Sequence, residues 1–197
     1  MTNPTLTNIN VKFVKEMLYP AVTICNMSPY KRSAINASAV MMSHLLHRSR
    51  LGDVFPPIDY TNPVYSELND SVSEDRLDKV SFGLNDNFAF CEHDKHLVSC
   101  ETILTPKITQ WEKCFTYNGN EKLRMEGRVK SSTTGSPTAL TFYMDIKQHE
   151  YVFNTNTAAG IKIVLHDPEE EPDIINTGFV SSPGMSTYVS VKMTKRN

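Results

Sequence analysis

The sequence predicts an α+β fold, in which an antiparallel sheet carries a mainly helical insertion. The second half of the chain alternates apolar and polar residues over 140–146, 161–165 and 189–193. Such alternation is typical of strands that bury one face and leave the other wetter. In the first half, apolar residues instead recur at helical spacing between Ser33 and Arg50. The two patterns together predict the fold class.

The first predicted strand follows Pro20. The run from Ala21 to Asn26 is rich in β-branched residues and ends in Cys25 and an Asn-x-Ser triplet. A cysteine beside a glycosylation triplet is typical of a strand in an oxidising, extracytoplasmic compartment. Two further Asn-x-Ser triplets follow in the chain, so the glycosylation candidates are Asn26, Asn36 and Asn69.

An amphipathic helix is predicted over 33–50, where the residues that share one apolar face are Ile35, Ala39, Met42 and Leu46. Prolines at positions 56, 57 and 63 prevent a helix in the next stretch. Ser71 and Glu74 have the spacing of a capping box, which predicts a short helix over 75–80. Turns at 135–137 and 182–184, each with a glycine and a proline, separate the later strands.

The net charge and the distribution of apolar residues exclude some classes of protein. A net charge of −2 gives no electrostatic case for nucleic-acid binding. No apolar run approaches the roughly 18 residues that a membrane helix needs. Residues 1–10 lack the apolar core of a signal peptide. The cysteines and glycosylation triplets are typical of an exported protein, but the sequence shows no export signal. We therefore expect an internal piece of a longer membrane protein.

Catalysis is not expected. Asp145, His149 and Glu150 form the only close set of residue types that act as acids or bases. On a strand, residues 145 and 149 would share one face and residue 150 would point to the other. The sequence has no nucleophile motif, phosphate loop or strong metal signature, so we expect neither an enzyme nor a cofactor.

The four cysteines, at positions 25, 91, 100 and 114, allow three pairings, and spacing does not choose among them. A zinc site is the alternative, because two thiolates and two imidazoles can bind zinc. Zinc modules usually have short Cys-x2–4-Cys and His-x3–5-His pairs, whereas here both histidines lie between two cysteines. A disulfide-closed loop is the preferred interpretation over zinc ligands at Cys91, His93, His96 and Cys100.

Motifs along most of residues 19–193 together resemble one known family. Residues 19–26 read Tyr-Pro-Ala-Val-Thr-Ile-Cys-Asn, and residues 112–118 read Glu-Lys-Cys-Phe-Thr-Tyr-Asn. Two alternating strands at 140–151 and 159–167 precede Gly178-Phe179 and a Pro-Gly-x-x-Thr turn that ends at Thr187. These motifs resemble, in order, those of the degenerin/epithelial sodium channel family, which includes the acid-sensing ion channels. The family usually has glycine at the position of Glu112.

The resemblance implies that Cys25 bonds Cys114 and that Cys91 bonds Cys100. It implies a palm and β-ball sheet with a mainly helical finger insertion, stapled by disulfides, without the family's thumb and membrane helices. Residues 1–28 would hold the start of the ectodomain and the first palm strand. Residues 29–112 would form the finger-like insertion with its small disulfide loop, and residues 113–197 the β-ball and central palm strands.

The function implied is the extracellular portion of a plasma-membrane sodium channel subunit that couples a stimulus to gating. Its partners would be sibling subunits of a homo- or heterotrimer, Na+ as the permeant ion, and a proton, peptide or cation as ligand. By position in the family's motifs, Glu150, Glu169 and Glu170 would line an acidic pocket that collapses when protons or cations neutralise it, because close like charges repel. The alternative is a secreted, disulfide-bonded β-rich binding module without channel activity.

Overall fold

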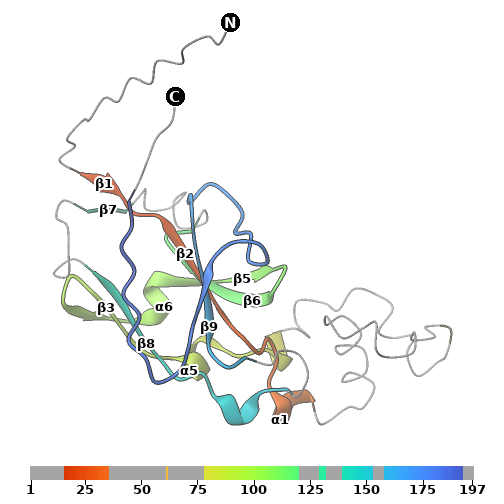
Figure 1. Cartoon of the computed structure of the whole chain (residues 1–197). Helices are drawn as coiled ribbons and strands as arrows, with labels where there is room; N and C mark the ends of the chain where they lie inside the picture. The colour runs from red at the N-terminus through yellow and green to blue at the C-terminus, as the bar shows by residue number, and fades with distance from the viewer. Residues whose placement is uncertain are drawn as a thin grey trace, which may run out of the picture.

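The computed structural model describes residues 16–35, 61, 78–119, 129–131, 139–152 and 158–192 (Figure 1). It is mostly antiparallel sheet with a few one-turn helices, so the predicted α+β class is confirmed. The strands form a five-stranded sheet, a three-stranded sheet and a two-stranded ribbon. The ribbon pairs β1 (Met17–Leu18) with β7 (Lys130–Ser131).

The five-stranded sheet has the order β10-β9-β2-β6-β5, and each neighbouring pair is antiparallel. Its central strand β2 has Ile24 opposite Phe115 on one side and Ile163 on the other. Pro106 lies in the edge strand β5, where a missing N–H group costs no ladder hydrogen bond. The strands are β2 (Ala21–Asn26), β5 (Leu104–Thr109), β6 (Glu112–Tyr117), β9 (Ile161–His166) and β10 (Phe179–Ser181).

The three-stranded sheet has the order β4-β3-β8 and holds the small disulfide. A tight turn joins β3 to β4, and its residues Asp94 and Lys95 both have positive φ, at 53° and 63°. Positive φ at both central positions matches the twist of a two-residue hairpin. The Cys91–Cys100 disulfide then ties β3 to the helix that follows β4. The strands are β3 (Phe88–His93), β4 (His96–Val98) and β8 (Leu140–Met144).

Short helices connect these strands. They are α1 (Arg32–Ile35), α5 (Leu84–Asn87), α6 (Cys100–Ile103) and the 3-10 turn η3 (Gln148–Glu150). None of the helices in the described residues is long and apolar enough to cross a membrane.

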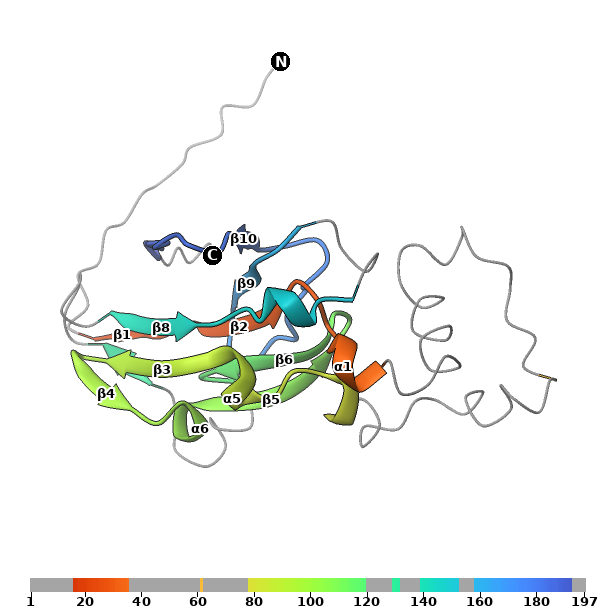
Figure 2. The same ribbon diagram turned by 90° about the horizontal axis from the view of Figure 1, so that it is seen from below.

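The main core lies between the two larger sheets, where β3 and β8 run alongside β2 and β6 (Figure 2). Phe88 packs edge-on against Phe115, with ring centroids 5.5 Å apart. Burial of such aromatic and aliphatic side chains supplies most of the favourable free energy of folding. The buried residues of this core are Ile24, Phe88, Cys91, Cys100, Leu104, Phe115 and Tyr117.

A second, smaller core covers the opposite face of the five-stranded sheet. The Cys25–Cys114 disulfide joins β2 to β6, and it packs with Val164 and Ile174, which are 1% and 0% exposed. Both disulfides thus have the pairing that the resemblance implies. The alternation in β9 predicts that Ile161, Ile163 and Leu165 form its buried face. The opposite face of β9 is also covered, because Ile174 of the segment after β9 packs against Val164. Val164 is therefore more deeply buried than the three residues of the predicted face.

Other elements differ from the sequence-based expectations. The helix predicted over 33–50 begins with α1, and residues 36–50 lie outside the described residues. The helix predicted over 75–80 is present at 78–80, and the rest lies outside the described residues. The strand predicted at 189–193 is wrong over 189–192, which has no strand and leaves Val189 and Val191 each 45% exposed. Alternation of apolar and polar residues predicts that one face of a segment is buried. It does not show whether another strand lies beside the segment to form hydrogen bonds with it.

Candidate functional site

Glu150, Glu169 and Glu170 lie on two different connections. Glu150 ends η3, between β8 and β9, whereas Glu169 and Glu170 follow β9. The ends of β9 are fixed by its register, since Ile161 lies opposite Asn26 and His166 opposite Ala21. A six-residue strand spans about 17 Å. Within this chain, therefore, the structure does not bring Glu150 together with the other two glutamates.

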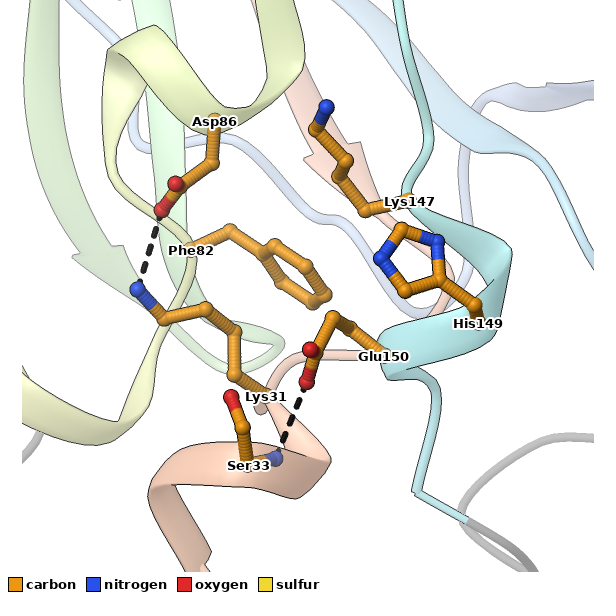
Figure 3. A pocket seen from close by; sticks show the side chains of 7 residues that line it. All are labelled: Lys31, Ser33, Phe82, Asp86, Lys147, His149 and Glu150. Carbon is orange, nitrogen blue, oxygen red and sulfur yellow. Dashed lines mark hydrogen bonds and ion pairs between the residues drawn. The ribbon is translucent and has the colours of Figure 1, made fainter.

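Glu150 lines a pocket of about 280 Å³ beside α1 (Figure 3). The pocket lies where α1, the start of α5 and η3 meet, beside the buried ring of Phe82. Its lining carries charges of both signs. The lining residues are Lys31, Ser33, Phe82, Asp86, Lys147, His149 and Glu150.

Glu150 binds the first turn of α1. Its Oε2 atom accepts a hydrogen bond from the backbone nitrogen of Ser33 at 2.9 Å. This backbone donor holds the pKa of Glu150 below its ordinary value, with the His149 and Arg32 charges acting in the same direction. A carboxylate with a lowered pKa stays ionised on mild acidification. Glu150 is therefore a poor candidate for the group that protons neutralise.

The other charges of the pocket are also paired. Lys31 Nζ lies 3.0 Å from Asp86 Oδ2, which also accepts a hydrogen bond from Gly83 N at 2.7 Å. Partial burial raises the pKa of Asp86, but these hydrogen bonds and the charge of Lys31 outweigh it, so the pKa is lowered. Lys147 Nζ lies 2.8 Å from Asp145 Oδ2, and this contact raises the pKa of Lys147. At the pocket, the Lys31–Asp86 ion pair joins the start of α1 to α5, and the hydrogen bond from Ser33 to Glu150 joins α1 to η3.

Glu169 and Glu170 lie in an exposed acidic segment that starts with a tight turn. The backbone nitrogen of Glu169 donates to Asp167 Oδ1, and that of Glu170 to the Asp167 carbonyl oxygen, both at 2.9 Å. Glu171 forms an ion pair with Lys107 of β5 at 2.6 Å. The turn thus holds two carboxylates at the surface while the third ties the segment to the sheet.

The structure describes one of the three glycosylation candidates and the alternative zinc site. Asn26 is 5% exposed, and its Nδ2 atom donates to Asn87 Oδ1 and to the Ile146 carbonyl oxygen. A glycan on this atom would replace one of these two donor hydrogens, whereas Asn36 and Asn69 lie outside the described residues. The Cys91–Cys100 disulfide removes both thiolates from the alternative zinc site with His93 and His96.

Sequence reasoning gave no role to Ser33, Lys31 or His166. Each acts through a contact between distant segments, and neither periodicity nor a local motif predicts such contacts.

Comparisons with known proteins place the chain in a family. The family model described as amiloride-sensitive sodium channel matches residues 1–197. The chain belongs to this family. It is a family of ion channels and not of enzymes.

Individual relatives support the same assignment. The bile acid-sensitive ion channel of Mus musculus is 28% identical over 98% of this chain and 40% of its own length. Acid-sensing ion channel 4 of Homo sapiens is 29% identical over 87% of the chain and 31% of its own length. Acid-sensing ion channel 4-B of Danio rerio is 27% identical over 96% of the chain and 34% of its own length. The chain therefore spans less than half the length of these amiloride-sensitive-type relatives.

Proposed function

We propose that this chain forms extracellular structure of a plasma-membrane sodium channel subunit, in which it couples a stimulus to gating. The observation that carries the proposal is the family match over residues 1–197. The Cys25–Cys114 and Cys91–Cys100 disulfides support an extracellular position, because disulfides persist in oxidising compartments. The full protein would assemble with sibling subunits as a homo- or heterotrimer and pass Na+.

Within this proposal, Glu169 and Glu170 form an acidic surface that responds to protons, cations or a peptide. Their exposure and the turn at Asp167 support this role, since both residues lie at the surface of the chain. Glu150 has a separate part in the proposal. Through Ser33 it couples the β8–β9 connection to the helical insertion.

Channel activity is tested by expressing the complete reading frame that contains this segment and recording whole-cell currents. We expect an inward current that disappears when external Na+ is replaced by a large organic cation. Surface-localised protein that carries no Na+ current under acid, peptide or mechanical stimulation would contradict the channel assignment. The secreted binding module would then become the better explanation of the fold.

The acidic surface is tested in the same recordings with the double variant Glu169→Gln/Glu170→Gln. Glu101, an exposed carboxylate on α6, supplies the matched control Glu101→Gln. We expect the double variant to flatten the pH dependence of the current and the control to leave it unchanged. An unaltered pH dependence in the double variant would remove these two residues from the sensing role.

A further inference from the structure

A row of hydrogen bonds crosses three strands of the five-stranded sheet and ends at His166. The Nε2 atom of His166 on β9 lies 2.9 Å from Thr23 Oγ1 on β2. Thr23 Oγ1 lies 2.9 Å from Thr116 Oγ1 on β6. On the other side of the ring, Nδ1 lies 2.9 Å from the carbonyl oxygen of Asp167. The row therefore ends beside the acidic segment, whose first residue, Asp167, directly follows His166.

The chemistry of these atoms fixes the direction of every hydrogen bond in the row. The Asp167 carbonyl oxygen can only accept, so Nδ1 of the neutral ring must carry the hydrogen. Nε2 then has a lone pair and accepts from the Thr23 hydroxyl. Thr23 Oγ1 in turn accepts from the hydroxyl of Thr116. A single neutral tautomer of His166 satisfies the whole row.

A second proton on His166 would exchange the donor and acceptor roles in the hydrogen bonds to Thr23 and Thr116. Nε2 would become a donor, so Thr23 would have to accept from it and turn its own hydrogen towards Thr116. Thr23 and Thr116 are 0% and 2% exposed. Among the described residues, the Thr116 hydroxyl has Thr23 as its partner, so its displaced hydrogen would lose its acceptor. A buried donor without an acceptor destabilises the folded state.

The groups around His166 act on its pKa in both directions. Lys107 of β5 faces the ring and disfavours a second positive charge, whereas Glu171 and the carbonyl groups of Asp167 and Glu170 favour it. Lys107 and Glu171 also pair with each other, which reduces the net field that either exerts. Burial is the largest effect, and it lowers the pKa of His166 below its ordinary value of 6.5.

We propose that His166 is a proton-sensitive tie between β9 and β2 at the start of the acidic segment 167–171. The neutral ring completes the row, whereas protonation reverses the Thr23–Thr116 hydrogen bond and weakens the tie. Because the pKa of His166 is lowered in the folded state, its contribution to stability is complete above pH 6.5. That contribution is lost as the pH falls through the lowered value. Its consequence for gating rests on the proposed channel function, whereas the tie itself does not.

The tie is tested first on the disulfide-bonded 197-residue chain, with ¹⁵N-labelled histidine and no substitution. We expect the His166 ring at pH 8 to carry its hydrogen on Nδ1, and to titrate below pH 6.5. A ring that carries its hydrogen on Nε2, or that titrates at or above 6.5, would overturn the proposal.

Variants then test the consequence for stability. His166→Gln keeps an acceptor for Thr23 but does not titrate in this range. We expect it to remove the fall in melting temperature that the wild-type chain shows between pH 7 and pH 5. His96, an exposed histidine on β4, supplies the control His96→Gln, which should retain the wild-type fall. Equal falls in wild type and His166→Gln would contradict the tie.

Recordings from the complete channel separate this inference from the proposed function. We expect His166→Gln to shift the pH of half-maximal response, and His96→Gln to leave it unchanged. Na+ currents with the same pH response in wild type and His166→Gln would refute the gating consequence and leave the channel assignment intact. Absence of any Na+ current would refute the channel assignment, while the ring titration would still decide the tie.

Discussion

The carboxylate of Glu150 accepts a hydrogen bond from the backbone nitrogen of Ser33, 117 residues earlier in the chain. Helices leave their first N–H groups without partners inside the helix, and a carboxylate is a favourable acceptor at this end. Glu150 therefore stabilises the start of α1 from the β8–β9 connection. The contact couples the start of α1 to that connection.

Glu150→Ala is expected to increase hydrogen exchange at the Ser33 amide, because the acceptor is removed. Glu150→Gln retains an acceptor oxygen and should increase the exchange less. The pKa of Glu150 is lowered from 4.5, so protection should be complete above pH 4.5 and should decrease as the pH falls through the lowered value. Amide exchange measured by NMR between pH 3 and pH 7 checks both expectations.

His149→Ala is the control for this contact, since its side chain is exposed on the same turn and accepts nothing from Ser33. Its Ser33 amide should exchange as in the wild type. The same exchange rate in Glu150→Ala and His149→Ala would show that Glu150 does not hold the helix start.

The two disulfides are expected to differ in their contributions to stability. Cys25 and Cys114 are 89 residues apart, whereas Cys91 and Cys100 are 9 apart. In the chain-entropy model, the longer loop is worth about 4–5 kcal/mol and the shorter about 3 kcal/mol. Urea unfolding of the two double Cys→Ala variants checks the order. A larger loss on removing the shorter loop would contradict it.

Gly160 and Gly178 allow β9 and β10 to approach each other. A Cβ atom on Gly160 would lie 2.3 Å from the Ser181 carbonyl oxygen, and φ there is +146°. We expect Gly160→Ala to destabilise the chain by at least about 2 kcal/mol more than Gly184→Ala. Gly184 also has a positive φ, of +72°, but no atom lies within 4 Å of its added Cβ. Urea unfolding measures the difference, and equal losses would disprove the steric explanation.

Glu112 has a φ of +68°, which is strained for a residue with a Cβ atom. It occupies the position where the family usually has glycine. We expect Glu112→Gly to stabilise the hairpin between β5 and β6 by about 0.5–1 kcal/mol. Gln110→Gly in the same turn is the control, and it should destabilise because Gln110 has no positive φ to relieve. A loss of stability in Glu112→Gly would show that its side-chain contacts outweigh the strain.

Much of the sheet follows from local pattern. The run at 21–26 forms the central strand, and the alternating segments at 140–144 and 161–166 form β8 and β9. These segments combine β-branched residues with neighbours that bury them. The edge strand β5 was not predicted, since Pro106 interrupts its pattern and only its position at the sheet edge tolerates the proline.

The site follows less well from sequence. The family motifs point to three glutamates, but they do not show that Glu150 is separated from Glu169 by the length of β9. Nor does any motif reveal the row from His166 to Thr116, because its members are far apart in the chain. Such contacts depend on strand register, and register is set by the whole sheet.

The central strand β2 is hydrogen-bonded on both sides, to β6 and β9, and leads directly towards α1. A strand held this way cannot slide lengthwise without breaking two ladders at once. A displacement of α1 along this direction would consequently act on the neighbouring strands together. The short β1–β7 ribbon lies just before β2, at the end of that strand away from α1, so it would receive the same displacement.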